Sequence, residues 1–228
     1  MEQHQKGSDF IRDVVIGMAD GLTVPFALAA GLSGAVDSTA IVITAGLAEI
    51  AAGSIAMGLG GYLAGQTEQE HYAAELAREH EEVIRVPDIE KAEVRAVLAD
   101  YGLSEPLQVA VADEMALNPK KWVDFMMRFE LGLEKPDIHR AKKSAFNIGT
   151  SYIVGGIIPL SPYFFTETSR EGLVYSCYIT VLTLLVFGYF KSRATGQPPV
   201  AGALKVAAIG TVAAGAAYFI AKLVGGAI

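Results

Sequence analysis

Apolar residues gather into long stretches along this chain, and one long polar region interrupts them in the middle. A stretch of about 20 apolar residues forms a helix long enough to cross the hydrocarbon core of a bilayer. The pattern predicts five membrane-spanning helices, over residues 10–33, 39–65, 142–161, 171–191 and 201–226. We therefore expect an all-α membrane protein.

Small residues recur one helical turn apart inside these stretches, as in the pairs Gly17/Gly21 and Gly61/Gly65. Such pairs let helix backbones approach closely, which matters in lipid because no hydrophobic force drives helices together there. Pro25 removes one backbone donor from the first helix and is expected to kink it. The composition thus predicts a tightly packed bundle.

The polar region 66–140 also has a helical pattern. The second helix meets no helix breaker before Pro87, and Gly102, Pro106 and Pro119 then separate three further short helices. We predict a helical domain that continues the second spanning helix. The chain is thereby divided into a membrane segment, a polar domain and a second membrane segment, at residues 1–65, 66–140 and 141–228.

Charge is distributed very unevenly. The chain carries a net charge of −7, and residues 66–140 contain 17 of its 25 acidic and 9 of its 18 basic residues, a net charge of −8. This balance does not favour the basic surface that binds nucleic acid, and we expect no nucleic-acid partner.

Basic residues in the short flanks of the apolar stretches predict the orientation, because such residues stay on the cytosolic side. They precede the first and third predicted helices and flank the loop between the fourth and fifth: Lys6, Arg12, Arg140, Lys142, Lys143, Lys191, Arg193 and Lys205. We expect the N-terminus and region 66–140 in the cytosol and the C-terminus on the opposite, lumenal side.

Acidic residues inside the apolar stretches carry the main chemical signal. Asp13 and Asp20 share one face of the first helix, and Glu49 and Met57 share one face of the second. Asp20 and Met57 each lie about 12 Å from the cytosolic boundary at 1.5 Å per residue. A charge at such depth costs about 3 kcal/mol or more, so it normally faces a cavity or a partner. Together these residues describe a path for a cation.

Blander interpretations stay open for these residues. Asp20 could form a structural polar pair between helices, with Asn147 and Tyr152 as candidate neighbours, although no Lys or Arg lies deep in any predicted span. Met57 alone would be read as a packing residue. A thioether at the depth of a carboxylate suits a borderline ion such as Fe²⁺ better than Mg²⁺ or Ca²⁺.

The polar domain contains a second group of candidate ligands. Carboxylates three or four residues apart on helices are a common way for helical bundles to bind metals. The candidates are Glu79, Glu82, Glu90, Glu93, Met126, Met127 and Glu130. Acidic helix faces are often only solvated, so each pair alone is weak support. His71, three residues after Glu68, is expected to be a solvated surface residue, because no second Glu-x-x-His follows.

The runs DVVIGMADGLTVPF, at residues 13–26, and GLAEIAAGSIAMG, at residues 46–58, resemble the vacuolar iron transporter family, and plant members in particular. The resemblance extends over essentially the whole chain, including the acidic helices. It departs at the N-terminus, where plant members often have a longer leader than the few residues before the first predicted helix.

The resemblance implies Fe²⁺/H⁺ antiport from the cytosol into the vacuole by a homodimer in the vacuolar membrane, with the path at the dimer interface. It implies Asp20 and Met57 as membrane ligands, with Asp13 and Glu49 along the route. The polar domain would bind metal through the seven candidates named above. Fe²⁺ would be the substrate, with Zn²⁺, Mn²⁺ or Co²⁺ as further ions, and no resident cofactor is expected.

Two rival functions fit parts of the same pattern. One is a membrane-anchored, ferritin-like ferroxidase, which would be an enzyme, and the other is a membrane-anchored iron buffer or sensor. Both leave Asp20 and Met57 without a role, so we favour a transporter that is not an enzyme.

Overall fold

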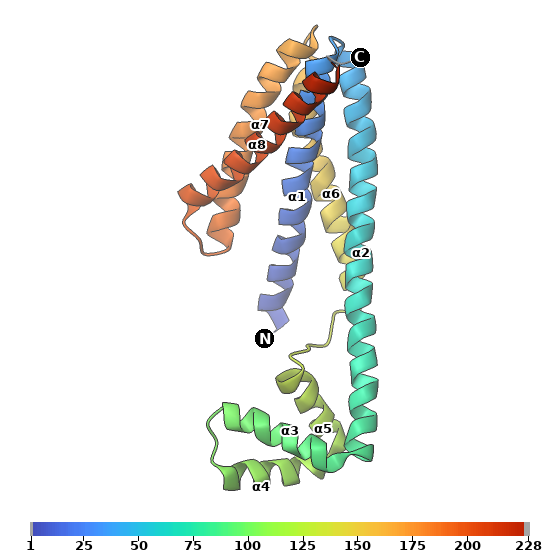
Figure 1. Cartoon of the computed structure of the whole chain (residues 1–228), viewed down its shortest axis with the longest axis vertical. Helices are drawn as coiled ribbons and strands as arrows, with labels where there is room; N and C mark the ends of the chain where they lie inside the picture. The colour runs from blue at the N-terminus through green and yellow to red at the C-terminus, as the bar shows by residue number, and fades with distance from the viewer. Residues whose placement is uncertain (1, 226–228) are drawn as a thin grey trace. The chain divides into compact units, whose positions relative to one another are not determined.

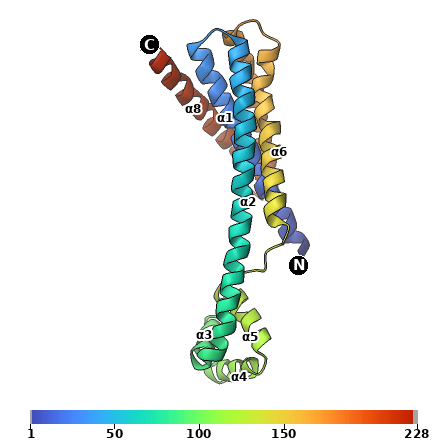
Figure 2. The ribbon, with the colours of Figure 1, turned by 90° about the vertical axis from the view of Figure 1, so that its right-hand side faces the viewer.

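The structure is a computed structural model that describes residues 2–225, with side chains described for residues 9–223, and within that range it is built from helices without a strand (Figures 1 and 2). The predicted end of the last span at residue 226 and the outer ends of the predicted segments, at residues 1 and 228, lie outside the described residues.

The helices follow one another with short connections. In chain order they are α1 (Glu2–Ala35), α2 (Thr39–Arg85), α3 (Pro87–Asp100), α4 (Glu105–Ala116), α5 (Pro119–Phe125), the π-helix η1 (Met126–Glu130), α6 (Arg140–Leu160), the 3-10 helix η2 (Ser161–Phe164), α7 (Ser169–Ala194) and α8 (Pro199–Gly225). Proline occupies the first turn of α3, α4 and α5, where its missing N–H costs no hydrogen bond.

Four helices of the described chain are long and apolar enough to cross a membrane: α1 from Asp9 onward, α2, α7 and α8. The prediction of an all-α membrane protein is confirmed. Helix α6 covers the third predicted span, 142–161, except for its last residue, but is not among the four, because polar residues such as Ser144, Asn147 and Ser151 interrupt its apolar pattern. A fifth span stays a prediction.

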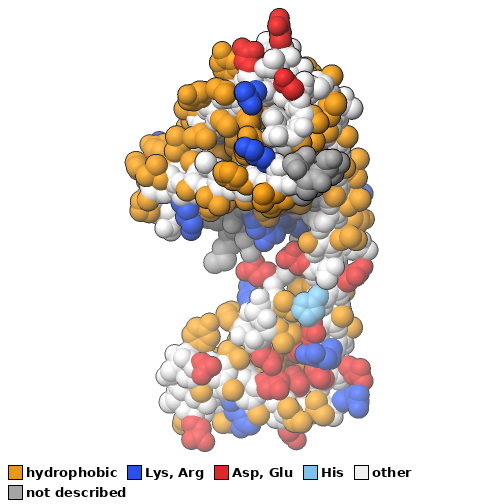
Figure 3. Space-filling view, turned by 45° about the horizontal axis from the view of Figure 1, so that its top comes forward, with side chains coloured by type: hydrophobic (Ala, Val, Ile, Leu, Met, Phe, Trp, Pro, Cys, Tyr) orange, Lys and Arg blue, Asp and Glu red, His pale blue; other side chains and the backbone are white. Residues whose placement is uncertain are grey.

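The chain divides into two compact units. The first comprises Met1–Leu63 and Ala141–Ile228, and the second comprises Ala64–Arg140. On the face seen in Figure 3, hydrophobic side chains cover much of the first unit, whereas most acidic side chains lie on the second. Each unit has its own buried apolar core.

Glycines bring α1 and α6 of the first unit into close contact. A Cβ added at Gly17 would overlap the carbonyl oxygen of Ile148, and one at Gly21 would overlap that of Tyr152. Only glycine fits at these two positions, so the small-residue pair seen in the sequence has a definite partner helix. The same helix α1 also packs along α7 and α8, where Leu22 and Leu184 are fully buried.

The second unit packs the short helices α3, α4 and α5 against the polar end of α2. Its core contains Val83 of α2, Val94 of α3, and Trp122, Met126 and Met127. The last of the three short helices begins at Pro119, as predicted, and its final turn, η1, is π-helical. Gly132, at a φ of 65°, ends this turn, and the backbone N–H of Leu133 then reaches Met127 O at 2.7 Å. This wider turn lets Leu131 and Leu133 pack on the core.

Candidate functional site

Asp13 lies buried between α1 and α6, with an exposed fraction of 1%. The hydroxyl of Ser144 donates a hydrogen bond to its Oδ1 at 3.1 Å, and the amide of Asn147 reaches its Oδ2 at 3.4 Å. Both donors come from one face of α6. The carboxyl group therefore sits in a polar pocket inside an otherwise apolar helix pair.

Glu49 connects α2 to α6. The hydroxyl of Tyr152 donates a hydrogen bond to Glu49 Oε1, while Oε2 is buried and has no hydrogen-bond partner among the described residues. Gly53, one turn further along α2, lies against the Tyr152 hydroxyl, and a Cβ there would overlap it. The glycine makes room for the tyrosine, and the tyrosine leaves one carboxylate oxygen of Glu49 available.

Asp20 lies half-buried on α1, next to Gly21, which contacts the Tyr152 backbone. Its carboxyl group acts electrostatically on the Tyr152 hydroxyl, as Glu49 also does. Neither candidate neighbour of Asp20 has a hydrogen bond to it in the described part of the chain, because Asn147 binds Asp13 and Tyr152 binds Glu49. Three helices thus bring Asp20 and Glu49 to one tyrosine.

Met57 is half-buried on the face of α2 that turns toward α6. It lies one turn from Gly53, which abuts Tyr152, and one turn from Gly61. A Cβ at Gly61 would come within 2.7 Å of Ile148 Cδ1 and 2.9 Å of Ser144 Oγ. Helical spacing therefore places Met57 on the side of α2 that carries Gly53 and Gly61.

Ser144 was not among the candidate residues, and Tyr152 was considered only as a neighbour of Asp20. A signal for both is present in the sequence. Ser144, Asn147, Ser151 and Tyr152 repeat at helical spacing on α6, so they form a polar stripe on an apolar helix. Such a stripe indicates a face that meets polar groups of neighbouring helices.

In the second unit, acidic side chains of three helices face one another. Glu79 of α2 and Glu90 of α3 are buried, with exposed fractions of 2% and 3%, and each has one carboxylate oxygen without a hydrogen-bond partner among the described residues. Glu82 and Glu93 beside them are half-buried, and Glu130 of η1 is exposed. The charges of these groups influence one another.

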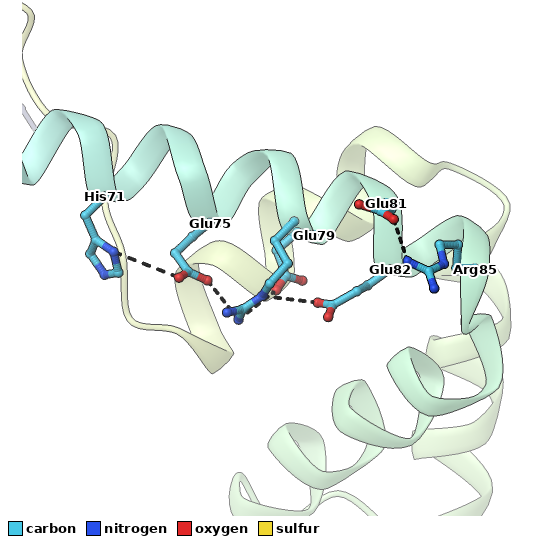
Figure 4. Close-up of polar contacts among 7 residues, drawn as sticks. His71, Glu75, Glu79, Glu81, Glu82 and Arg85 are labelled. Atoms are coloured by element: carbon cyan, nitrogen blue, oxygen red, sulfur yellow. Dashed lines mark hydrogen bonds and ion pairs between the residues drawn. The ribbon is translucent and has the colours of Figure 1, made fainter.

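Arg78 supplies the cation closest to this acidic cluster (Glu79, Glu82, Glu90, Glu93 and Glu130). Its guanidinium lies 2.8 Å from Glu75, 3.4 Å from Glu82 and 3.9 Å from Glu79 (Figure 4). One arginine cannot neutralise so many carboxylates. The cluster therefore keeps an excess of negative charge that a divalent cation could balance.

Burial and, after it, the charges of Glu130 and Glu82 together raise the pKa of Glu79 to about 7, against the opposing effect of Arg78. Burial and, after it, the charge of Glu93 raise the pKa of Glu90 to about 7 as well. Glu130 is exposed over much of its surface, but the part of it that is buried and the charge of Glu93 still raise its pKa. Protons thus occupy part of the cluster near neutral pH.

Met126 and Met127 lie in the core of the second unit, where they are almost fully buried together with Trp122 and Val123. Here they serve as packing residues for the turn that presents Glu130. His71 is exposed, with its Nδ1 3.9 Å from a Glu75 oxygen (Figure 4), as expected for a surface histidine.

No three His, Cys, Asp or Glu side chains within residues 9–223 lie close enough together to hold a metal ion as they stand. The first unit offers separate carboxylates along α1 and α2, and the second offers a wider group of acids around Glu79 and Glu90. An ion would have to draw these side chains closer when it binds.

The chain was also compared with known proteins. The model of the VIT family matches residues 11–222. Vacuolar iron transporter 1 of Tulipa gesneriana is 53% identical over 223 residues, which cover 98% of this chain and 90% of the relative. Vacuolar iron transporter 1 of Arabidopsis thaliana is 52% identical over 98% of this chain and 89% of its own length. Protein CCC1 of Saccharomyces cerevisiae is 39% identical over 94% of this chain and 69% of its own length. The names of the two plant relatives describe transporters, in agreement with the prediction that this chain is not an enzyme.

Proposed function

The chain belongs to the vacuolar iron transporter (VIT) family, and from this membership we propose that it moves Fe²⁺ from the cytosol into the vacuole in exchange for protons. The observation that carries the proposal is the placement of Asp13, Asp20 and Glu49 within packed, apolar helices. Carboxylates inside a membrane mark ion or proton pathways, because their desolvation is otherwise unfavourable.

The proposed path follows α1, α2 and α6. Fe²⁺ enters past Asp13, binds between Asp20 and Met57, and leaves past Glu49. The thioether of Met57 would favour Fe²⁺, and related ions such as Zn²⁺, Mn²⁺ and Co²⁺, over Mg²⁺. Support comes from the buried oxygen of Glu49 that has no hydrogen-bond partner among the described residues, and from the helical spacing of Met57 with Gly53 and Gly61, which contact α6.

The proposed topology has α6 as a fifth span. Its 21 residues are enough to cross the hydrocarbon core, and its polar stripe meets Asp13 and Glu49 instead of lipid. With five spans, the N-terminus and residues 66–140 lie in the cytosol and the C-terminus in the lumen. We further propose a homodimer with the ion path at its interface.

The second unit would collect metal ions in the cytosol. Its net charge of −8 attracts cations, and the acidic cluster supplies carboxylates that a bound ion could draw together. Met126 and Met127 could join as soft ligands only if the core around them rearranges. Bound ions would then raise the local concentration at the mouth of the path.

Protons and Fe²⁺ would compete for Asp20. A metal ion that binds a carboxylate must displace any proton that the group holds. An acidic lumen would reprotonate Asp20 and release the ion toward Glu49. One residue would thereby couple the two fluxes without a separate proton wire.

Reconstitution into liposomes that contain an iron-sensitive dye tests the proposal. The wild-type protein should deliver Fe²⁺ to the lumen faster when the lumen is acidic, and Asp20→Asn should fold but lose transport at every pH. Glu167→Gln, an exposed loop residue, is the matched control and should transport normally. Iron uptake driven by pH in a folded Asp20→Asn protein would refute the coupling, while absence of uptake by wild type would refute transport itself. A ferroxidase or a buffer would deliver no ion to the lumen.

A further inference from the structure

The hairpin of α7 and α8 carries an open groove on its surface. Its volume is about 310 Å³, and it is lined by Leu185, Val186, Tyr189, Phe190, Val200, Ala203 and Leu204. Phe190 and Leu204 are each 61% exposed, so the walls are not covered by other described parts of the first unit. The lining is apolar, as an acyl chain requires.

Small residues create the floor of this groove. A Cβ at Gly188 would come within 2.8 Å of Ala203 Cα, so the two helix backbones meet closely there. Gly188 and Ala203 are buried, and the larger side chains on either side of them stand out as walls. The groove therefore results from backbone packing and does not depend on one mobile side chain.

A basic residue stands at the end of the groove nearest the turn between the two helices. Arg193 lies one turn beyond Tyr189 on the same side of α7 and is exposed, whereas Lys191, two residues from Tyr189, lies on another side of the helix. Lys205 follows the lining residue Leu204 on α8, farther from the turn. None of these three has an ion pair in the part of the chain that the structure describes. No acidic residue follows Glu171 in the sequence.

We propose that this groove binds an anionic phospholipid of the surrounding membrane, with an acyl chain between α7 and α8 and the phosphate on Arg193. The apolar lining and the cationic end match the two halves of one such lipid. Basic residues beside a membrane surface attract anionic headgroups in this way. Tyr189 at the boundary of the two halves fits the preference of tyrosine for the membrane interface.

A second copy of the chain fits the groove less well. A symmetric dimer places the same patch of both subunits face to face. The basic ends of two hairpins would then approach each other with no acidic residue after Glu171 to balance them. Like charges at an interface are unfavourable, whereas the phosphate of a lipid carries the opposite charge.

Native mass spectrometry of the full chain in detergent tests this site. The probes are two phospholipids with identical acyl chains, one with a neutral phosphocholine and one with an anionic phosphoglycerol headgroup. Wild type should bind the anionic lipid about tenfold more tightly, and Arg193→Gln should reduce that preference about fivefold, the effect of one basic residue near a headgroup. Leu204→Gln should weaken binding of both lipids. Lys222→Gln, an exposed lysine at the opposite end of α8, is the matched control and should change nothing.

Equal affinity for the two lipids would overturn the proposal, as would an unchanged preference in Arg193→Gln or an equal loss in Lys222→Gln. Disulfide crosslinking between copies through Val200→Cys, in a Cys177→Ser background, would also overturn it by showing that a second copy occupies the groove. Absence of that crosslink together with the Arg193-dependent preference supports the lipid site.

Discussion

When the acidic cluster binds a metal ion, Glu79 and Glu90 should release a number of protons that can be measured. Burial raises the pKa of both carboxyl groups to about 7, so each is about half protonated at neutral pH. An ion that needs both as carboxylates displaces about one proton at pH 7, about two at pH 5.5 and almost none at pH 8.5. With ordinary glutamate pKa values the release at pH 5.5 would be only about 0.2.

The same arithmetic fixes the pH dependence of affinity. Below pH 7, where two protons must leave, the apparent affinity should fall up to about 100-fold for each pH unit, whereas it should be nearly constant above pH 8. The sign is unambiguous, since protons and the metal ion compete for the same oxygens.

Isothermal titration calorimetry of the full chain with Zn²⁺, which has no redox chemistry, measures both quantities. Titrations in buffers of different ionisation enthalpy give the number of protons released at each pH. Glu90→Gln should lower the release by about one proton at pH 5.5, because glutamine does not ionise. Glu81→Gln is the matched control, since Glu81 is exposed and pairs with Arg85 outside the cluster.

A proton release that stays constant between pH 5.5 and 8.5 would refute the reasoning. So would a release that falls equally in Glu90→Gln and Glu81→Gln, because the protons would then come from elsewhere in the chain.

Three further predictions concern single side chains. Met57→Leu conserves volume and should cost less than about 1.5 kcal/mol of stability, yet it should slow Fe²⁺ uptake into liposomes; uptake equal to wild type would make Met57 a packing residue. Tyr152→Phe removes the hydroxyl that holds Glu49 and should weaken the apparent affinity for Fe²⁺ about tenfold or more, measured as a rise in KM in the uptake assay. Tyr175→Phe, at an exposed tyrosine, is the control, and an unchanged KM in Tyr152→Phe would show that Tyr152 does not position Glu49. Glu79→Gln should stabilise the metal-free protein at pH 8 but not near pH 4.5. The reason is that folding raises the pKa of the Glu79 carboxyl group to about 7, so this group lowers the stability of the fold as pH rises from about 4.5 through 7. Thermal unfolding at the two pH values measures the effect, and equal changes in Tm at both would contradict it.

The sequence alone determined the class of the protein. Long apolar stretches predicted an all-α membrane protein because the thickness of the bilayer sets the length of a span, and that prediction is confirmed. The runs around Asp13, Asp20, Glu49 and Met57 also indicated the family, which the VIT model and the plant relatives confirm. Prolines and glycines located most helix ends of residues 66–140, since they act on the local backbone.

Only the tertiary structure decided which side chains meet. Tyr152 and Glu49 are 103 residues apart in sequence, and Ser144 and Asp13 are 131 apart, so no local pattern could pair them. Asn147 and Tyr152 were candidate polar neighbours of Asp20, and the packing of α6 against the glycines of α1 and α2 directs their hydrogen bonds to Asp13 and Glu49. The position of Met126 and Met127 in the core was likewise not visible in sequence, because the same residue type serves as a soft ligand or as an apolar filling. Contacts between distant helices depend on how whole faces pack, and that is a property of the folded chain.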